Sequence, residues 1–273
     1  MRRAFSRGLL LLAFGAVLVF VFLPAARLHA VTGLRILMAM SIELPYAAPP
    51  SVPEWTALPA AARLQDVRRR VQPQLERELI ARGLRLGRPV FIRIFKESRE
   101  FELWVQDEAS AWKKFRTYPI ATYSGSLGPK LAEGDGQAPE GFYDVVRERM
   151  NPASRYHLAF NIGYPNAHDR HHARTGSLIM VHGDRVSIGC FAMTDPVIEE
   201  IYLLVAEALE NGQRSVAVHS FPFRMTPERM QQAVTSGGSW LAFWENLRVG
   251  YDAFEKTGRI PKVSVREGRY EFH

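Results

Sequence analysis

A histidine and the chain's single cysteine, His182 and Cys190, lie eight positions apart. The apolar residues before His182 predict a strand that ends at this histidine, and a short loop of glycine and polar residues then leads to Cys190. The thiolate is the reactive form of cysteine, and a free thiol has a pKa of about 8.5, so a neighbouring imidazole must take the proton or hold it in an ion pair. The spacing predicts Cys190 as a nucleophile and His182 as its general base. An ion pair would make Cys190 alkylate fast near neutral pH.

Two glycines are expected to shape this site. Gly189 allows a tight backbone turn before Cys190, and we expect its N–H group, together with that of Cys190, to form an oxyanion hole. A general base needs an orienting partner, and the backbone carbonyl of Gly183 can serve His182 in this way. The competing interpretation of Cys190 is a small buried residue, which is the usual role of a lone cysteine.

Composition narrows the class of protein. One cysteine excludes an intrachain disulfide and any multi-cysteine zinc or iron–sulfur site. The net charge is +7, and residues 1–35, which hold five arginines and no acidic residue, contribute +5 of it. The remaining +2 argues against a nucleic-acid partner, because such proteins concentrate basic residues in their folded part.

Residues 1–30 are interpreted as a signal peptide or a membrane anchor. Arg2, Arg3 and Arg7 precede an apolar run over residues 8–23, which fits both. The candidate cleavage site at Leu28-His29-Ala30 does not decide between them. Either form places the rest of the chain outside the cytoplasm, so we expect a periplasmic protein that contacts the membrane only through an uncleaved segment.

The elements that must position His182 and Cys190 follow from periodicity. Residues 31–87 predict a proline-rich linker and then a helix over residues 60–82, in which Pro73 predicts a kink or two short helices. Residues 88–225 predict a β-rich domain that contains one helix. We expect this helix to begin at Asp195, with the Asp195 side chain as its N-cap. Its strands are expected over residues 90–95, 101–105, 115–121, 141–146, 156–160, 177–182 and 215–221.

Residues 226–273 predict a helical extension and one short strand over residues 263–272. The expected fold class is therefore α+β: a β-rich domain with helical additions at its N- and C-terminal ends. Trp240, Trp244, Leu247 and Tyr251 recur at helical spacing, and we expect them to form a packing face.

His182-Gly183 followed by Ser187-Ile-Gly189-Cys190 resembles the active-site signature of the L,D-transpeptidase (YkuD-like) catalytic domain. Stretches over residues 123–130, 133–143 and 151–165 extend the resemblance to residues 88–225, and the pattern is similar to the YafK-type murein L,D-transpeptidase subgroup. The resemblance implies an antiparallel or mixed, β-sandwich-like catalytic domain. Ile188 and Ala192 depart from the wider family, which commonly carries His or Arg before the Gly-Cys and Arg two positions after the cysteine.

The resemblance also implies a reaction without a cofactor. Cys190 would attack the L-centre carbonyl of meso-diaminopimelate in a peptidoglycan stem peptide and form a thioester. Attack by an amine would then make the enzyme a transpeptidase. Attack by water would make it an L,D-carboxypeptidase, or an amidase that releases a group attached to diaminopimelate, such as a wall-attached protein. A zinc peptidase and an inactive wall-binding module are competing interpretations of the whole chain.

Four further residues are candidates for binding the stem peptide. Arg155, Arg174 and Arg185 flank the predicted site, and a guanidinium binds a carboxylate in a planar fork. Ser187 is expected to shape the loop before Cys190. For each arginine, a surface ion pair is the competing interpretation.

A histidine-rich segment, His168-Asp169-Arg170-His171-His172, has the residue types of a zinc site. It follows and precedes glycine- and proline-containing stretches, which favour a loop with no fixed helical face. We expect a solvated or substrate-facing loop here, and no metal.

Overall fold

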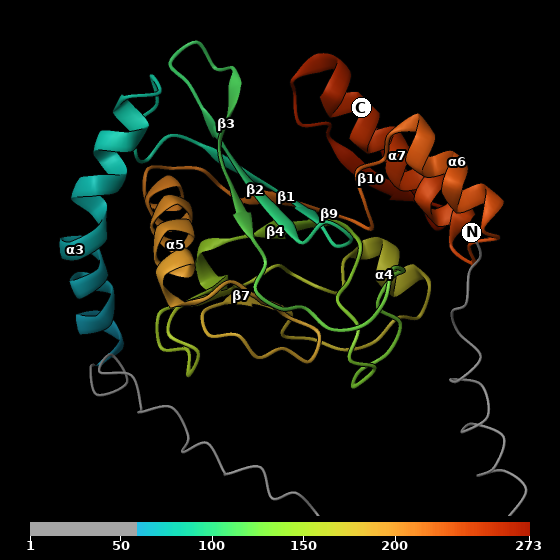
Figure 1. Cartoon of the computed structure of the whole chain (residues 1–273), viewed down its shortest axis with the longest axis horizontal. Helices are drawn as coiled ribbons and strands as arrows, with labels where there is room; N and C mark the ends of the chain where they lie inside the picture. Colours follow the sequence, from blue (N-terminus) through green and yellow to red (C-terminus); the bar gives the residue numbers. More distant parts are fainter. Residues whose placement is uncertain (1–58) are drawn as a thin grey trace, which may run out of the picture. The chain divides into compact units, whose positions relative to one another are not determined.

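The computed structural model describes residues 59–273. The predicted signal or anchor and most of the predicted linker fall in residues 1–58, outside the described residues. The described part is an α+β fold in which helices flank two mixed β-sheets, as expected, with a C-terminal hairpin (Figure 1). Within residues 59–273, no helix is both long and apolar enough to cross a membrane.

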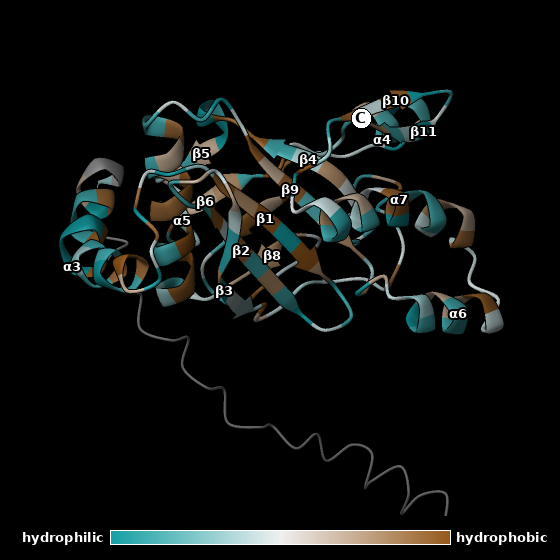
Figure 2. Ribbon diagram, turned by 90° about the horizontal axis from the view of Figure 1, so that it is seen from above, coloured by the Kyte–Doolittle hydropathy of each residue, from teal (hydrophilic) through white to brown (hydrophobic). Residues whose placement is uncertain are grey.

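The first described element is one continuous helix, α3 (Ala60–Ile80), so the expectation of two short helices is wrong. Pro73 lies inside α3 on its exposed side, where water can satisfy the carbonyl that proline leaves without a partner. Val67, Leu75 and Leu79 are buried, and the helix packs against α5 (Asp195–Glu210). Figure 2 shows that α3 is largely hydrophilic on its outer side, whereas α5 is mostly hydrophobic.

Five strands form the larger sheet in the order β3-β2-β1-β9-β4, in which β1 and β9 are parallel and the other neighbours antiparallel. Their bounds are β1 (Val90–Phe95), β2 (Glu100–Gln106), β3 (Trp112–Pro119), β4 (Gly141–Val145) and β9 (Val216–Phe221). Every residue of β1 is buried. Both faces of β1 are covered, because α5 packs near one and the C-terminal extension near the other.

The smaller sheet carries the candidate site and has the order β5-β6-β7-β8. Its strands are β5 (Met150–Asn151), β6 (Ala159–Asn161), β7 (Met180–His182) and β8 (Phe191–Ala192), and β7 and β8 are parallel. A short 3₁₀ turn, η2 (Arg147–Arg149), precedes β5. Helix α5 contacts β1 as well as β6 and β7, so both sheets share one hydrophobic core with this helix.

Helix α5 begins at Asp195 as expected, but Thr194 occupies the N-cap position. The Asp195 Oδ1 atom accepts a hydrogen bond from the Asp184 N–H at 2.7 Å. Asp195 therefore ties the start of the helix to the loop that follows His182.

The C-terminal extension comprises α6 (Pro227–Thr235), α7 (Leu241–Thr257) and a hairpin, β10 (Val263–Arg266) and β11 (Arg269–Phe272). The hairpin replaces the single expected strand. Trp244, Leu247 and Tyr251 are buried in a second core that also contains Phe95 and Phe221 of the large sheet. The predicted packing face of α7 is therefore confirmed.

Candidate active site

Strand β7 places His182 at its end, where the sequence predicted it, and buries its side chain to 2 % exposure. The Nδ1 atom of His182 lies 2.5 Å from the carbonyl oxygen of Gly183. Because a carbonyl only accepts, Nδ1 carries the proton and Nε2 is left with a free lone pair. This contact gives the imidazole the form that a general base needs.

Gly183 leaves no room for a side chain. A Cβ atom there would lie 2.4 Å from Asp195 Oδ1 and 2.7 Å from the carbonyl oxygen of Tyr156. The Gly183 N–H group donates to the carbonyls of Tyr156 and Leu158. The carbonyl that orients His182 is thus held by close packing on several sides.

Cys190 lies one residue before β8, beside β7, and its side chain is partly exposed. Its Sγ atom accepts a hydrogen bond from the Met180 N–H at 3.4 Å and donates to the Leu178 carbonyl at 3.6 Å. Within residues 59–273, no hydrogen bond joins Cys190 to His182. Both side chains line one cleft of about 500 Å³, so the structure brings the predicted pair together with the thiol turned toward Leu178.

Burial shifts the pKa values of both predicted catalytic groups so that each group favours its neutral form. It raises the pKa of the Cys190 thiol above its ordinary value, an effect opposed by the Met180 N–H and the Lys130 charge. Burial also lowers the pKa of His182, opposed by its bond to Gly183 and by two nearby aspartates. Burial therefore favours a neutral thiol and a neutral imidazole in the free site, which argues against the fast alkylation expected near neutral pH.

The loop before Cys190 is fixed by its own hydrogen bonds. Ser187 Oγ donates to the Cys190 carbonyl at 2.6 Å and accepts from the Gly189 N–H at 3.3 Å. Gly189 has φ +123°, a conformation that residues with a side chain rarely adopt. The Cys190 N–H has no hydrogen-bond acceptor among residues 59–273. Of the two predicted oxyanion donors, the N–H of Cys190 is therefore unengaged among the described residues, whereas that of Gly189 is bonded to Ser187.

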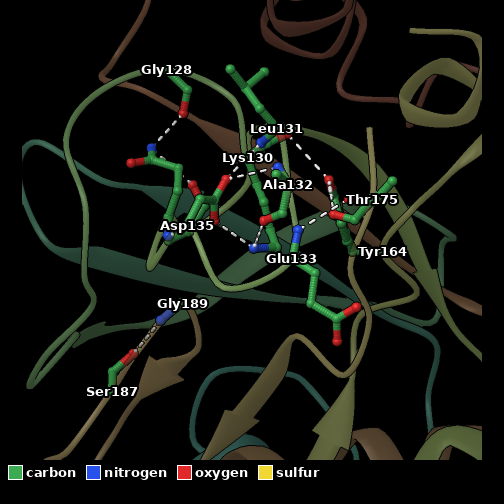
Figure 3. A network of polar contacts seen from close by, with 12 residues as sticks. Gly128, Lys130, Leu131, Ala132, Glu133, Asp135, Tyr164, Thr175, Ser187 and Gly189 are labelled. Atoms are coloured by element: carbon green, nitrogen blue, oxygen red, sulfur yellow. Dashed lines mark hydrogen bonds and ion pairs between the residues drawn. The ribbon is translucent and has the colours of Figure 1, made fainter. Parts of the chain in front are cut away.

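A loop over residues 128–137 forms one wall of the cleft, a role that the sequence did not predict for it. Asp135 holds it together, because its carboxylate accepts from the N–H groups of Leu131, Ala132 and Gln137 and from Lys130 Nζ (Figure 3). These bonds hold the pKa of Asp135 at about 2, against the opposing effect of burial. Thr175 joins this loop to the segment before β7 through bonds to Leu131 and Glu133.

Tyr156 is a second contact that sequence reasoning missed. Its ring packs on that of His182 with centroids 4.8 Å apart. Arg63 of α3 secures this segment, since its Nη1 donates to the carbonyls of Ser154 and His157, each at 2.7 Å. These contacts join residues about 90 positions apart, so no local sequence pattern could have predicted them.

The four candidate substrate-binding residues lie in different places. Arg155 lines the cleft with His182 and Cys190. Arg174 is buried, pairs with Asp169 at 2.8 Å and lines a separate pocket, so its assignment to the cleft is corrected. Arg185 is exposed on the loop after Gly183 and, like Ser187, lies outside the cleft-lining residues.

The histidine-rich segment forms a short helix, α4 (Ala167–His171), so the expected solvated loop is wrong. A capping box explains the helix, because the Asn166 and Asp169 side chains each bond the other's backbone N–H. His168 is buried and stacks on Tyr270 at 4.3 Å, which fixes one face of the segment against the hairpin. Within residues 59–273, no group of three or more His, Cys, Asp or Glu side chains could hold a metal ion.

Comparison with known proteins defines the class of enzyme to which this fold and site correspond. Residues 89–219 match the family described as the L,D-transpeptidase catalytic domain, YkuD. The chain is 49% identical over 185 residues to a protein named "Putative L,D-transpeptidase YafK" from Escherichia coli strain K12, covering 68% of this chain and 74% of that protein. The same identity and coverage hold for the protein of that name in E. coli O157:H7.

The chain therefore belongs to the L,D-transpeptidase family of peptidoglycan enzymes, which act on stem peptides. Solved structures also match. The helical cell shape determining protein Pgp2 from Campylobacter jejuni is 19% identical, with a TM-score of 0.41, over 66% of this chain and 73% of that one. Bd1075 from Bdellovibrio bacteriovorus is 20% identical, with a TM-score of 0.35, over 68% and 82%.

Proposed function

We propose that this chain is an exported cysteine acyltransferase that acts on peptidoglycan stem peptides through a thioester on Cys190. One observation carries the mechanism: Gly183 fixes His182 as the Nδ1–H tautomer in the cleft that also contains Cys190. Membership of the L,D-transpeptidase family supports the substrate class.

In the first half-reaction, substrate binding turns the Cys190 thiol from Leu178 toward His182, which takes the proton on Nε2 as sulfur attacks the L-centre carbonyl of diaminopimelate. The Cys190 N–H stabilises the oxyanion of the tetrahedral intermediate. The C–N bond to the terminal D-residue then breaks, and the imidazolium returns its proton to the leaving amine. A thioester and a free D-amino acid are the products.

The second half-reaction transfers the acyl group to an acceptor. An amine of another stem peptide, or of a wall-attached protein, gives a new amide and regenerates the thiol, which is L,D-transpeptidation. Water in the same position gives a carboxylate, which makes the enzyme an L,D-carboxypeptidase or an amidase. Both outcomes use the same acyl-enzyme, and transpeptidation is the activity that the family's name describes.

Export follows from the arginines and the apolar run within residues 1–30. Peptidoglycan lies outside the cytoplasm, so the proposed substrate requires the export that this segment predicts. The proposed location is the periplasm, with a cleaved signal or an inner-membrane anchor.

The test is incubation of the full chain, purified in detergent, with peptidoglycan and with a wall-attached peptide adduct, followed by mass analysis of the muropeptides. We expect cross-linked dimers that are absent from a parallel reaction with the Cys190→Ala variant. Trimmed stems or a released adduct without cross-links would instead establish the hydrolase. Unchanged muropeptides would contradict the proposal.

A further inference from the structure

We propose that Glu133 and Arg155 are the specificity-determining residues of the cleft, and that they bind the ammonium and carboxylate groups at the free D-centre of diaminopimelate. The inference rests on the proposed function. It extends the proposed function because it names the part of the donor that the cleft recognises. It also predicts which stem peptides are poor substrates.

Glu133 presents a free negative charge to the cleft. Its side chain is exposed and, among residues 59–273, it has no ion-pair or hydrogen-bond partner. Its backbone is nevertheless fixed, because its N–H donates to Thr175 Oγ1 at 3.1 Å. Figure 3 shows the side chain extending away from the contacts that hold the loop around Asp135. A carboxylate on a fixed backbone is suited to meet a cation of the substrate.

Arg155 presents a free positive charge to the same cleft. Its guanidinium lies over the Tyr156 ring, 4.9 Å from the ring centroid, and Nη2 donates to the Tyr156 hydroxyl at 2.8 Å. Because the Tyr156 ring also packs on His182, the guanidinium is held in a defined relation to the predicted base. No carboxylate pairs with Arg155 among the described residues, so its remaining donors are available to an anion.

The other charged groups near the site are already engaged. Lys130 also lines the cleft, but it is buried and its Nζ bonds to Asp135 at 2.5 Å and to the Ala132 carbonyl. Arg174 is paired with Asp169 in a different pocket. Within residues 59–273, Glu133 and Arg155 are therefore the cleft-lining charges without an oppositely charged partner.

The donor carries the complementary pattern. When Cys190 attacks the L-centre carbonyl of diaminopimelate, the side chain of that residue is a short methylene chain that ends in a D-centre with a free amino and a free carboxyl group. Exposed Leu178 and Ile188 give the cleft apolar surface for the methylenes. A zwitterion at the end of an aliphatic chain fits one negative, one positive and two apolar side chains.

The test measures the rate at which Cys190 is acylated, by intact-protein mass spectrometry of the full chain in detergent, with three tetrapeptide donors. The first contains meso-diaminopimelate, the second has its D-centre amine acetylated, and the third has its D-centre carboxylate amidated. For the wild type we expect about tenfold slower acylation by each modified donor, the effect of losing one charged hydrogen bond.

In the Glu133→Gln variant, the acetylated donor should acylate Cys190 as fast as the unmodified donor does. The amidated donor should remain about tenfold slower. Arg155→Gln should do the reverse, and Arg155→Lys should restore part of the preference. The exposed pair Arg85 and Glu108 supplies matched controls, Arg85→Gln and Glu108→Gln, which should keep both preferences. A variant that only disturbs the fold slows all donors together and leaves the ratios unchanged.

The outcomes separate this inference from the proposed function. Equal acylation of the wild type by all three donors overturns the recognition of the D-centre and leaves the thioester mechanism standing. Ratios that are unchanged in both Gln variants overturn the assignment to Glu133 and Arg155. Absence of any acyl-enzyme overturns the proposed function, and this inference with it.

Discussion

The Nδ1 atom of His182 is hydrogen-bonded to the carbonyl of the next residue, Gly183, at 2.5 Å. A backbone carbonyl thus takes the place that an aspartate occupies in a Ser-His-Asp triad. Its position depends on the absence of a side chain at Gly183, because a Cβ atom would collide with Asp195 and with the Tyr156 carbonyl.

Gly183→Ala is therefore expected to displace the carbonyl and turn the imidazole. We expect acylation to fall by about 10²-fold, the effect of a small misplacement of a reacting group. Stability should fall by about 1–3 kcal/mol from overpacking. Donor acylation and urea unfolding measure the two effects. Wild-type acylation in a folded variant would show that this carbonyl does not orient the base.

The pH dependence of the two groups follows from burial. Burial raises the Cys190 pKa above its ordinary value, so less thiolate is present at any pH than in a free cysteine. We expect alkylation by iodoacetamide to be slow at pH 7 and to rise into the alkaline range. His182, with its pKa lowered below 6.5, stays neutral as the pH falls through that value, so donor acylation should persist below pH 6.5. A plateau of fast alkylation at neutral pH would contradict this neutral pair.

His182→Gln separates catalysis from thiol titration. The variant should acylate about 10²-fold more slowly, because the general base is lost. Its alkylation curve should keep the wild-type midpoint, because burial favours a neutral thiol and imidazole over an ion pair in the wild type. The same samples give both readouts, with the melting temperature as the control for folding. A midpoint that moves to higher pH would reveal a thiolate–imidazolium pair in the wild type.

Helix α3 is expected to support the wall of the cleft through Arg63. Arg63→Met removes two charged hydrogen bonds to the carbonyls of Ser154 and His157, and should cost about 1.5–3 kcal/mol of stability. It should also raise KM, since this segment carries Arg155 and Tyr156. Arg69→Met is the matched control, because Arg69 is exposed on the same helix. Equal effects of the two substitutions on KM would contradict the role of Arg63.

The buried pair Lys96 and Glu140 joins the loop that forms the cleft wall to the C-terminal extension. Lys96 Nζ bonds to Glu140 and to the Gly128 carbonyl, and Glu140 also accepts from Trp244 Nε1 at 2.8 Å. Lys96→Met should cost about 3–5 kcal/mol, because it leaves a buried carboxylate without its partner. Urea unfolding measures this, and a loss below about 1 kcal/mol, as expected for the exposed control Arg85→Met, would contradict it.

Local patterns predicted much of the fold. Periodicity identified the strands β1 and β2 and the helix that begins at Asp195, α5. Helix α4 was missed because its five residues are too few for periodicity, and the capping box that stabilises it is a side-chain contact. Complete burial of β1 was missed because α7, far along the chain, packs near its second face.

The candidate site likewise has residues that the sequence predicted and contacts that it did not predict. His182, Gly183 and Cys190 lie within nine positions of one another, so their spacing indicated their chemistry. The contact of Tyr156 with His182 depends on the tertiary fold. The contact of Asp135 with Lys130 depends on the conformation of one loop. Neither follows from a local sequence pattern. Arg174 was misplaced because proximity in sequence to β7 says nothing of its ion pair with Asp169.

The most direct measurement of the thioester mechanism is the intact mass of the full chain after brief exposure to a meso-diaminopimelate tetrapeptide. We expect a mass increase equal to the mass of the donor minus that of the released D-amino acid, mapped to Cys190 and removed by hydroxylamine, and no increase in the Cys190→Ala variant. An unmodified wild type that still converts the donor, or a Cys190→Ala variant that retains activity, would contradict the account.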